Sequence, residues 1–167
     1  MDDRAIIKEI RNNIKKGDSN KAIELLKSNE HLLEVMTPFG TWLHIASKRG
    51  DMEVIKYLVS KGIDVNVCGG TFEANALKTA AGAGQLEVVK YLLDNGSDMD
   101  ISFAKKNPLF GAIYGGHFDV VQELIKRGID ITVRYTSDSL TDMDAYGYAR
   151  EFGQTEIADY LKQLLNK

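Results

Sequence analysis

The chain has 167 residues, 44% of them hydrophobic and 27% charged, which is enough to bury the core of one globular domain. The net charge of −3 argues against nucleic-acid or membrane-surface binding, and the single cysteine, Cys68, excludes an internal disulfide bond. No stretch approaches the roughly 18 consecutive apolar residues of a membrane span, and the start Met1-Asp2-Asp3-Arg4 is unlike a signal peptide. We therefore expect a cytoplasmic protein.

Residues 1–35 resemble an incomplete copy of a two-helix unit that recurs along the chain. Gly17-Asp18 would separate the two helices, and Asn29 stands where later units have a closing glycine. The second helix would carry apolar residues at helical spacing, namely Ala22, Ile23, Leu25 and Leu26. We expect this unit to cap the N-terminal end of the repeats.

Residues 36–67 form the clearest unit. Thr41 is placed to cap a first helix, because its hydroxyl can accept a hydrogen bond from a free backbone N–H group, and Gly50 breaks the chain after that helix. A second helix is predicted over residues 52–60, and Gly62 suits the left-handed residue just beyond its end. The unit therefore reads as helix, turn, helix.

The same plan recurs in residues 68–101 and 102–133. Twelve residues separate the first glycine of each unit from the second, and the first glycines follow one another at steps of 34 and 32 residues. The glycine pairs are Gly50 and Gly62, Gly84 and Gly96, and Gly116 and Gly128. A fixed period of this size predicts a solenoid of stacked helix pairs.

Residues 134–167 are a less regular last unit. Ala149 and Gly153 keep the four-residue spacing between the alanine and the first glycine of earlier units. Residues 133–143 form the longest predicted loop, and extra length in a solenoid collects on the binding face. The prediction is one domain over residues 1–167 with five helix pairs, of which the first and last act as caps.

Several of these features resemble the ankyrin repeat family. Thr41-Trp42-Leu43-His44-Ile45-Ala46 resembles the signature T-P-L-H-x-A of that family, with tryptophan in place of proline. Gly62-Ile63-Asp64-Val65-Asn66 and Gly96-Ser97-Asp98-Met99-Asp100 resemble its G-A-D-V-N. The resemblance implies an all-α ankyrin-repeat solenoid of about five helix-turn-helix units, with β-hairpin fingers projecting from one side.

The resemblance also implies where a partner docks, which is on the fingertips and on the concave face of the first helices. On that face we expect the two residues before each first glycine, namely Lys48 and Arg49, Gly82 and Ala83, Tyr114 and Gly115, and Glu151 and Phe152. The family places glycine at the fingertip turn, whereas this chain has Phe39, Glu73, Lys105 and Asp142.

Candidate protein-binding residues lie on these surfaces and in the segment 133–143. They are Phe72, Phe103, Lys105, Tyr114, Arg134, Tyr135, Asp138, Asp142, Glu151 and Phe152. Aromatic anchors commonly carry binding hot spots, and Tyr114, Tyr135 and Phe152 fall at positions that are exposed in the family. The fingertip phenylalanines, which include Phe39, either contact a partner or pack finger against finger.

Negative charge gathers near the last concave surface. Asp138, Asp142, Asp144 and Glu151 lie there among tyrosines, and this mixture would suit a basic partner surface.

The residue types of catalysis and metal binding are present without the required patterns. His44 is expected to join neighbouring loops by hydrogen bonds and to be structural. Asp138, Asp142 and Asp144 lack the spacing of a calcium loop, and residues 111–116 lack the Lys and Ser/Thr of a phosphate-binding loop. We therefore predict no catalytic residue, no metal site and no cofactor.

The function implied by the resemblance is non-catalytic protein binding. Some bacterial members of the family are immunity proteins that block a cognate toxin, and the acidic aromatic segment suggests that role here, with a basic toxin domain as the partner. The alternative is an adaptor that tethers partners without inhibiting them. We expect a monomer when the protein is free.

Overall fold

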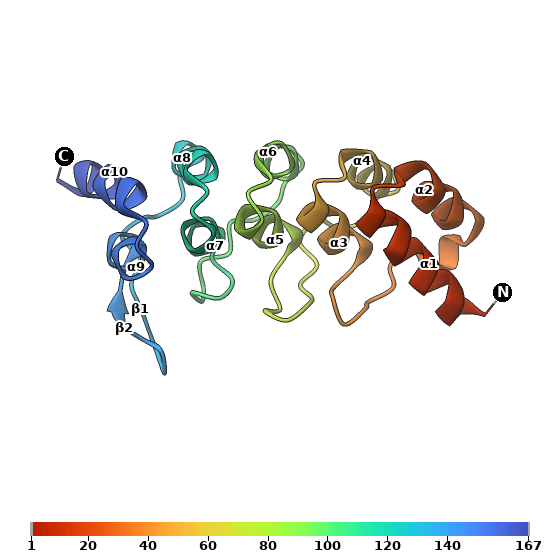
Figure 1. The fold of residues 1–167 in the computed structure, drawn as a ribbon, viewed down its shortest axis with the longest axis horizontal. Helices are drawn as coiled ribbons and strands as arrows, with labels where there is room; N and C mark the ends of the chain where they lie inside the picture. Colours follow the sequence, from red (N-terminus) through yellow and green to blue (C-terminus); the bar gives the residue numbers. More distant parts are fainter. Residues whose placement is uncertain (1, 167) are drawn as a thin grey trace.

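The computed structural model describes residues 2–166, which form ten α-helices arranged as two parallel rows (Figure 1). One row, here called the inner row, consists of α1 (Asp3–Lys16), α3 (Trp42–Arg49), α5 (Ala76–Gly82), α7 (Pro108–Gly115) and α9 (Ala145–Glu151). The outer row consists of α2 (Ser19–Ser28), α4 (Met52–Ser60), α6 (Leu86–Asp94), α8 (Phe118–Lys126) and α10 (Thr155–Leu165). A short 3₁₀ helix, η1 (Glu30–Leu32), follows α2.

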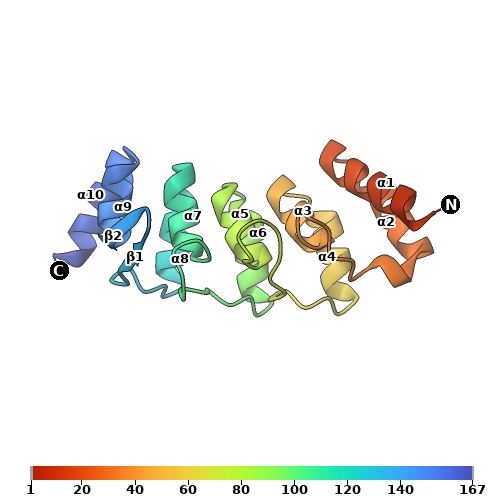
Figure 2. The ribbon, with the colours of Figure 1, turned by 90° about the horizontal axis from the view of Figure 1, so that it is seen from below.

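Successive units stack side by side, so that the two ends of the chain lie at opposite ends of the molecule (Figures 1 and 2). Each inner helix contacts the next along the row. The loop that joins each outer helix to the next inner helix projects to one side, and these loops are the fingers (Figure 1). The last finger contains β1 (Tyr135–Ser137) and β2 (Leu140–Met143). This arrangement is the predicted solenoid of stacked helix pairs.

Glycines end the helices where the spacing predicted, and two of them are required for a second reason. Gly50 and Gly84 both have positive φ, at 81° and 71°. A Cβ atom at Gly50 would lie 2.4 Å from Oε1 of Gln85, and one at Gly84 would lie 2.5 Å from Nδ1 of His117. The residue after each first glycine therefore folds back over the glycine of the preceding unit.

These contacts are completed by hydrogen bonds between units. Gln85 Nε2 donates to the carbonyl of Lys48 at 3.3 Å, and His117 Nε2 lies 3.3 Å from the carbonyl of Gly82. Because carbonyls at the end of a helix have no intrahelical partner, these side chains satisfy them while joining neighbouring units.

The core runs continuously through the stack and includes the one tryptophan. Trp42 is fully buried, and its Nε1 donates to the carbonyl of Leu32 at 2.7 Å. The indole fills space between the first two units and satisfies its own polar atom there. The N-terminal unit is thereby attached to the regular repeats.

The segment 133–143 is not the loop predicted from the sequence. Strands β1 and β2 pair antiparallel, with Tyr135 opposite Met143 and Ser137 opposite Leu140. The first two fingers are less regular, since a single isolated bridge closes each of them, at Thr37–Gly40 and at Gly69–Ala74. Strand pairing within the described residues is thus confined to the last finger.

Two fingertip residues adopt a backbone conformation that favours glycine. Glu73 has φ of 48° and Asp142 has φ of 46°. Both occupy positions where the family pattern has glycine. In the second unit Gly40, next to Phe39, takes the positive φ instead, at 92°.

Candidate protein-binding surface

Five aromatic rings form a continuous series from the last finger to the concave face. Tyr135 packs edge-on against Phe110 at 5.0 Å between centroids, and Phe110 stacks on Tyr148 at 4.5 Å. Tyr148 contacts Phe152 at 4.6 Å between centroids. Phe152 in turn packs edge-on against Tyr114 at 5.1 Å. The series joins α7, α9 and β1 into one rigid surface, since edge-on and offset rings are favourable contacts.

The concave end of this series is open to solvent. Tyr114 is 63% exposed and Phe152 is 41% exposed, although both are large apolar side chains. We call these two residues the aromatic patch. Both were predicted from the sequence, and the structure brings them into direct contact.

Tyr135 is not the exposed contact residue that the sequence suggested. Its hydroxyl donates to the carbonyl of Ile101 at 2.6 Å and accepts from Nδ2 of Asn107 at 3.0 Å. Burial raises the pKa of this phenol. The side chain is half-buried and links the last finger to the one before it.

The acidic cluster expected beside the aromatics is partly neutralised. Arg134 binds the carboxylate of Asp142 through Nε and that of Asp144 through Nη1, both at 2.7 Å. The hydrogen bond from Arg134 lowers the pKa of Asp142. Asp144 also accepts from the backbone N–H of Gly147 at 2.8 Å and caps α9. These groups hold the hairpin. Of the four acids, Asp138 and Glu151 are exposed and have no ion pair within residues 2–166.

The rings of the three fingertip phenylalanines do not contact one another. Phe39, Phe72 and Phe103 are 52%, 51% and 57% exposed, and no ring contact within residues 2–166 joins any two of them. Each ring has a cationic side chain near one face. Lys105, beside Phe103 in sequence, is exposed as expected. These residues are therefore available to a partner.

Sequence reasoning overlooked Lys78. It occupies, in Asn75-Ala76-Leu77-Lys78, the place that His44 takes in the second unit. Its Nζ lies 4.3 Å from the centre of the Phe72 ring, and burial lowers the pKa of the ammonium. Lysine stands here where the family signature has histidine, and this difference was the signal that could have identified Lys78.

The middle of the inner row has small residues at the positions where its neighbours have large ones. Lys48 and Arg49 are exposed on one side and Tyr114 on the other, whereas Gly82 and Ala83 between them are half-buried. A Cβ atom at Gly111 would lie 3.5 Å from Cα of Gly82, so α5 and α7 pack closely.

His44 is structural, as predicted. The imidazole is 3% exposed, and its Nε2 lies 2.8 Å from the carbonyl of Ala74 in the next unit. Since a carbonyl only accepts, Nε2 carries the proton and Nδ1 accepts from the backbone N–H of Thr41 at 3.2 Å. The Thr41 hydroxyl lies 2.9 Å from the same Nδ1, and Thr41 and His44 form a reciprocal capping box at the start of α3, as the predicted threonine cap required.

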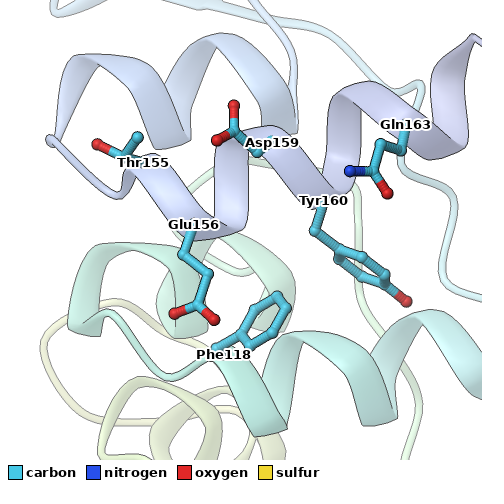
Figure 3. Close-up of a pocket in the computed structure, with 6 residues that line it drawn as sticks. All are labelled: Phe118, Thr155, Glu156, Asp159, Tyr160 and Gln163. Carbon is cyan, nitrogen blue, oxygen red and sulfur yellow. The ribbon is translucent and has the colours of Figure 1, made fainter.

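A shallow groove of 560 Å³ lies on the outer row, between α8 and α10 (Figure 3). Glu156, Phe118 and Tyr160 turn toward one another there, and the two rings meet edge-on at 5.3 Å. The groove lies on the outer row, whereas the aromatic patch lies at the ends of the inner helices α7 and α9. In residues 2–166, no group of three or more His, Cys, Asp or Glu could hold a metal ion, and no helix is long and apolar enough to cross a membrane.

Comparison with known proteins agrees with this architecture. The family model described as ankyrin repeats (3 copies) matches residues 13–103 and 43–135. A search of curated proteins found no match. Ankyrin repeats generally mediate protein–protein interaction and typically act as non-enzymatic binding modules. The matched residues cover most of the chain, which therefore belongs to the ankyrin repeat family.

Proposed function

We propose that this protein is a non-catalytic module that occupies the surface of a partner protein through its concave face and fingertips. The observation that carries the proposal is the aromatic patch. Tyr114 and Phe152 expose large apolar surface, yet neighbouring rings hold both in place. Rigid aromatic side chains lose little conformational entropy on binding, so they are efficient anchors.

The remaining contact residues of the proposed surface surround this anchor. Glu151 lies next to Phe152, Asp138 stands at the tip of the last hairpin, and the fingertips add Phe72, Phe103 and Lys105. Arg134, Tyr135 and Asp142 support the hairpin that carries Asp138 and have a positioning role. The surface as proposed spans α7, α9 and the fingers.

Occupying a partner can have two consequences. An immunity protein inhibits the toxin that it binds, and the resemblance to bacterial members of the family favours this role. An adaptor leaves the partner active. The argument for a basic toxin domain is weaker than the sequence suggested, because Arg134 already neutralises Asp142 and Asp144.

Affinity capture from a lysate of the source organism tests the proposal, with the purified protein as bait and the Tyr114→Ala/Phe152→Ala variant as the matched bait. We expect one stoichiometric partner with the first bait and strong depletion with the second. Equal capture by both baits would contradict the proposed surface. The activity or toxicity of the purified partner, measured with and without this protein, then separates inhibition from tethering.

A further inference from the structure

Cationic side chains accompany the phenylalanines along the fingers. Lys15 Nζ lies 4.8 Å from the ring centre of Phe39, and Lys106 Nζ lies 6.0 Å from that of Phe103. Between them Lys78 lies over Phe72, and Arg11 also approaches Phe39, at 5.3 Å. We call Arg11, Lys15, Lys78, Lys105 and Lys106 the cation row. It places at least one positive charge at each of three successive fingers.

Most of this positive charge is not compensated within the protein. Among the ion pairs of residues 2–166, only Lys106 of the cation row takes part, with Asp100 at 3.6 Å. The Nε atom of Arg11 is buried without a hydrogen-bond partner in the described part of the chain. Glu73 is the one carboxylate at the tip beside Phe72. At the tips of these three fingers the five cations therefore outnumber the carboxylates of Glu73 and Asp100, although other finger residues are acidic and the whole chain carries −3.

We propose that the fingers bind an acidic, extended segment of the partner protein, an inference that rests on the proposed function and specifies its partner. Charge complementarity selects an acidic sequence, because carboxylates would supply the counter-charges that the cation row lacks. The exposed phenylalanines add apolar contacts beside each charge. The partner is thus acidic where it meets the fingers, rather than basic.

The spacing of the units indicates the shape of this segment. Packed helices lie about 8–10 Å apart, so successive fingers repeat at about that distance. A polyproline II helix has three residues per turn and rises about 3.1 Å per residue, which places every third side chain on one face about 9 Å apart. An acidic residue at every third position would therefore meet one finger after another.

Single-stranded nucleic acid also combines negative charge with apolar rings, but it fits less well. Such ligands are bound by stacking bases on free aromatic faces. Here a cationic side chain already covers one face of each ring. We therefore infer a protein segment, and an oligonucleotide serves as a competing probe.

Fluorescence anisotropy with labelled peptides tests the inference without knowledge of the natural partner. The probe is a peptide of repeated Glu-Pro-Pro triplets, compared with a Lys-Pro-Pro peptide, with a peptide of equal composition whose glutamates are clustered, and with an oligo-dT strand. We expect the Glu-Pro-Pro peptide to bind most tightly. Its affinity should fall as salt rises from about 25 to 150 mM, because surface charges are then screened.

Charge reversal locates the contact. Lys15→Glu with Lys105→Glu changes two exposed residues of the cation row and should weaken peptide binding about tenfold. The matched control, Lys126→Glu with Lys162→Glu, makes the same change in charge at exposed positions of α8 and α10 and should leave binding nearly unaltered. Circular dichroism verifies that both variants fold.

Several outcomes would overturn the inference: tighter binding of the lysine peptide or of oligo-dT, no preference for the triplet spacing, no binding of any peptide, or equal weakening by both double reversals. These results would not affect the proposed function if a captured partner still depended on Tyr114 and Phe152. Failure to capture a partner through the aromatic patch would contradict the proposed function itself.

Discussion

At the scale of single residues, His44 shows how burial gives a histidine a pH-dependent role in stability. Its Nε2 donates to Ala74, and its Nδ1 accepts from Thr41. Protonation of Nδ1 would make it a donor that faces the backbone N–H of Thr41, which is also a donor. Burial lowers the pKa of this imidazole below its ordinary value of 6.5, an effect that the hydrogen bond to Ala74 partly offsets.

The consequence is a loss of stability at mildly acidic pH. Below pH 6.5 the unfolded chain takes up a proton at His44 before the folded chain does, so the free energy of unfolding falls as pH falls through this range. The His44→Gln variant should be less stable at pH 7.5 by about 2 kcal/mol, because buried partners lose their hydrogen bonds. Urea unfolding between pH 7.5 and 5.5 measures both effects. An equally steep pH dependence in the variant would contradict this account.

Glu73 has a strained backbone conformation at an exposed position. Its φ of 48° is unfavourable for a residue with a Cβ atom, and its side chain is exposed. We expect Glu73→Gly to raise the free energy of unfolding by about 0.5–1 kcal/mol, since glycine relieves the strain but loses more chain entropy on folding. Thermal and urea unfolding provide the measurement, and destabilisation by this substitution would show that the turn is not strained.

At the scale of elements, the contact between His117 and Gly84 couples two neighbouring units. Gly96 and Gly84 both have positive φ, but a Cβ atom at Gly96 would meet nothing within 4 Å, whereas one at Gly84 would meet the His117 ring. We expect Gly96→Ala to cost about 1 kcal/mol from backbone strain and Gly84→Ala about 2 kcal/mol from strain and overlap.

A double-mutant cycle separates these two contributions. In a His117→Ala background the excess cost of Gly84→Ala over Gly96→Ala should disappear, because the overlapping ring has been removed. The His117→Ala variant alone is the reference for the lost contact with Gly82. An unchanged excess in that background would assign the cost to the backbone and would contradict the coupling between units.

Elements were predictable where local chemistry decides them. Helix α4 spans Met52–Ser60, as the sequence indicated, because the apolar spacing, the Asp51 cap and the following glycine all act within a few residues. The family resemblance implied β-hairpin fingers, but the residue pattern of 133–143 indicated only a loop, since the pairing of β1 with β2 depends on cross-strand contacts such as that of Arg134 with Asp142. Local pattern carries no direct signal for such a contact.

At the scale of the whole molecule, the sequence indicated the solenoid, but it did not indicate which charges of the proposed binding surface are paired in the fold. Tyr114 and Phe152 were each predicted to contact a partner. Their contact with each other depends on the packing of α7 against α9. Pairing of Arg134 with two aspartates and the position of Lys78 over Phe72 are also tertiary contacts. Charges counted along a sequence do not reveal which of them are neutralised in the fold.

The concave face and fingers, rather than the outer row, are expected to bind. Calorimetric titration of the captured partner into three proteins tests this expectation most directly: the unaltered chain, Tyr114→Ala/Phe152→Ala, and Tyr160→Ala on the outer row. We predict that the double variant binds at least about a hundredfold more weakly, equivalent to about 2.7 kcal/mol, while Tyr160→Ala binds nearly as the unaltered chain does. Unchanged affinity in the double variant, or a larger loss in Tyr160→Ala, would contradict the account.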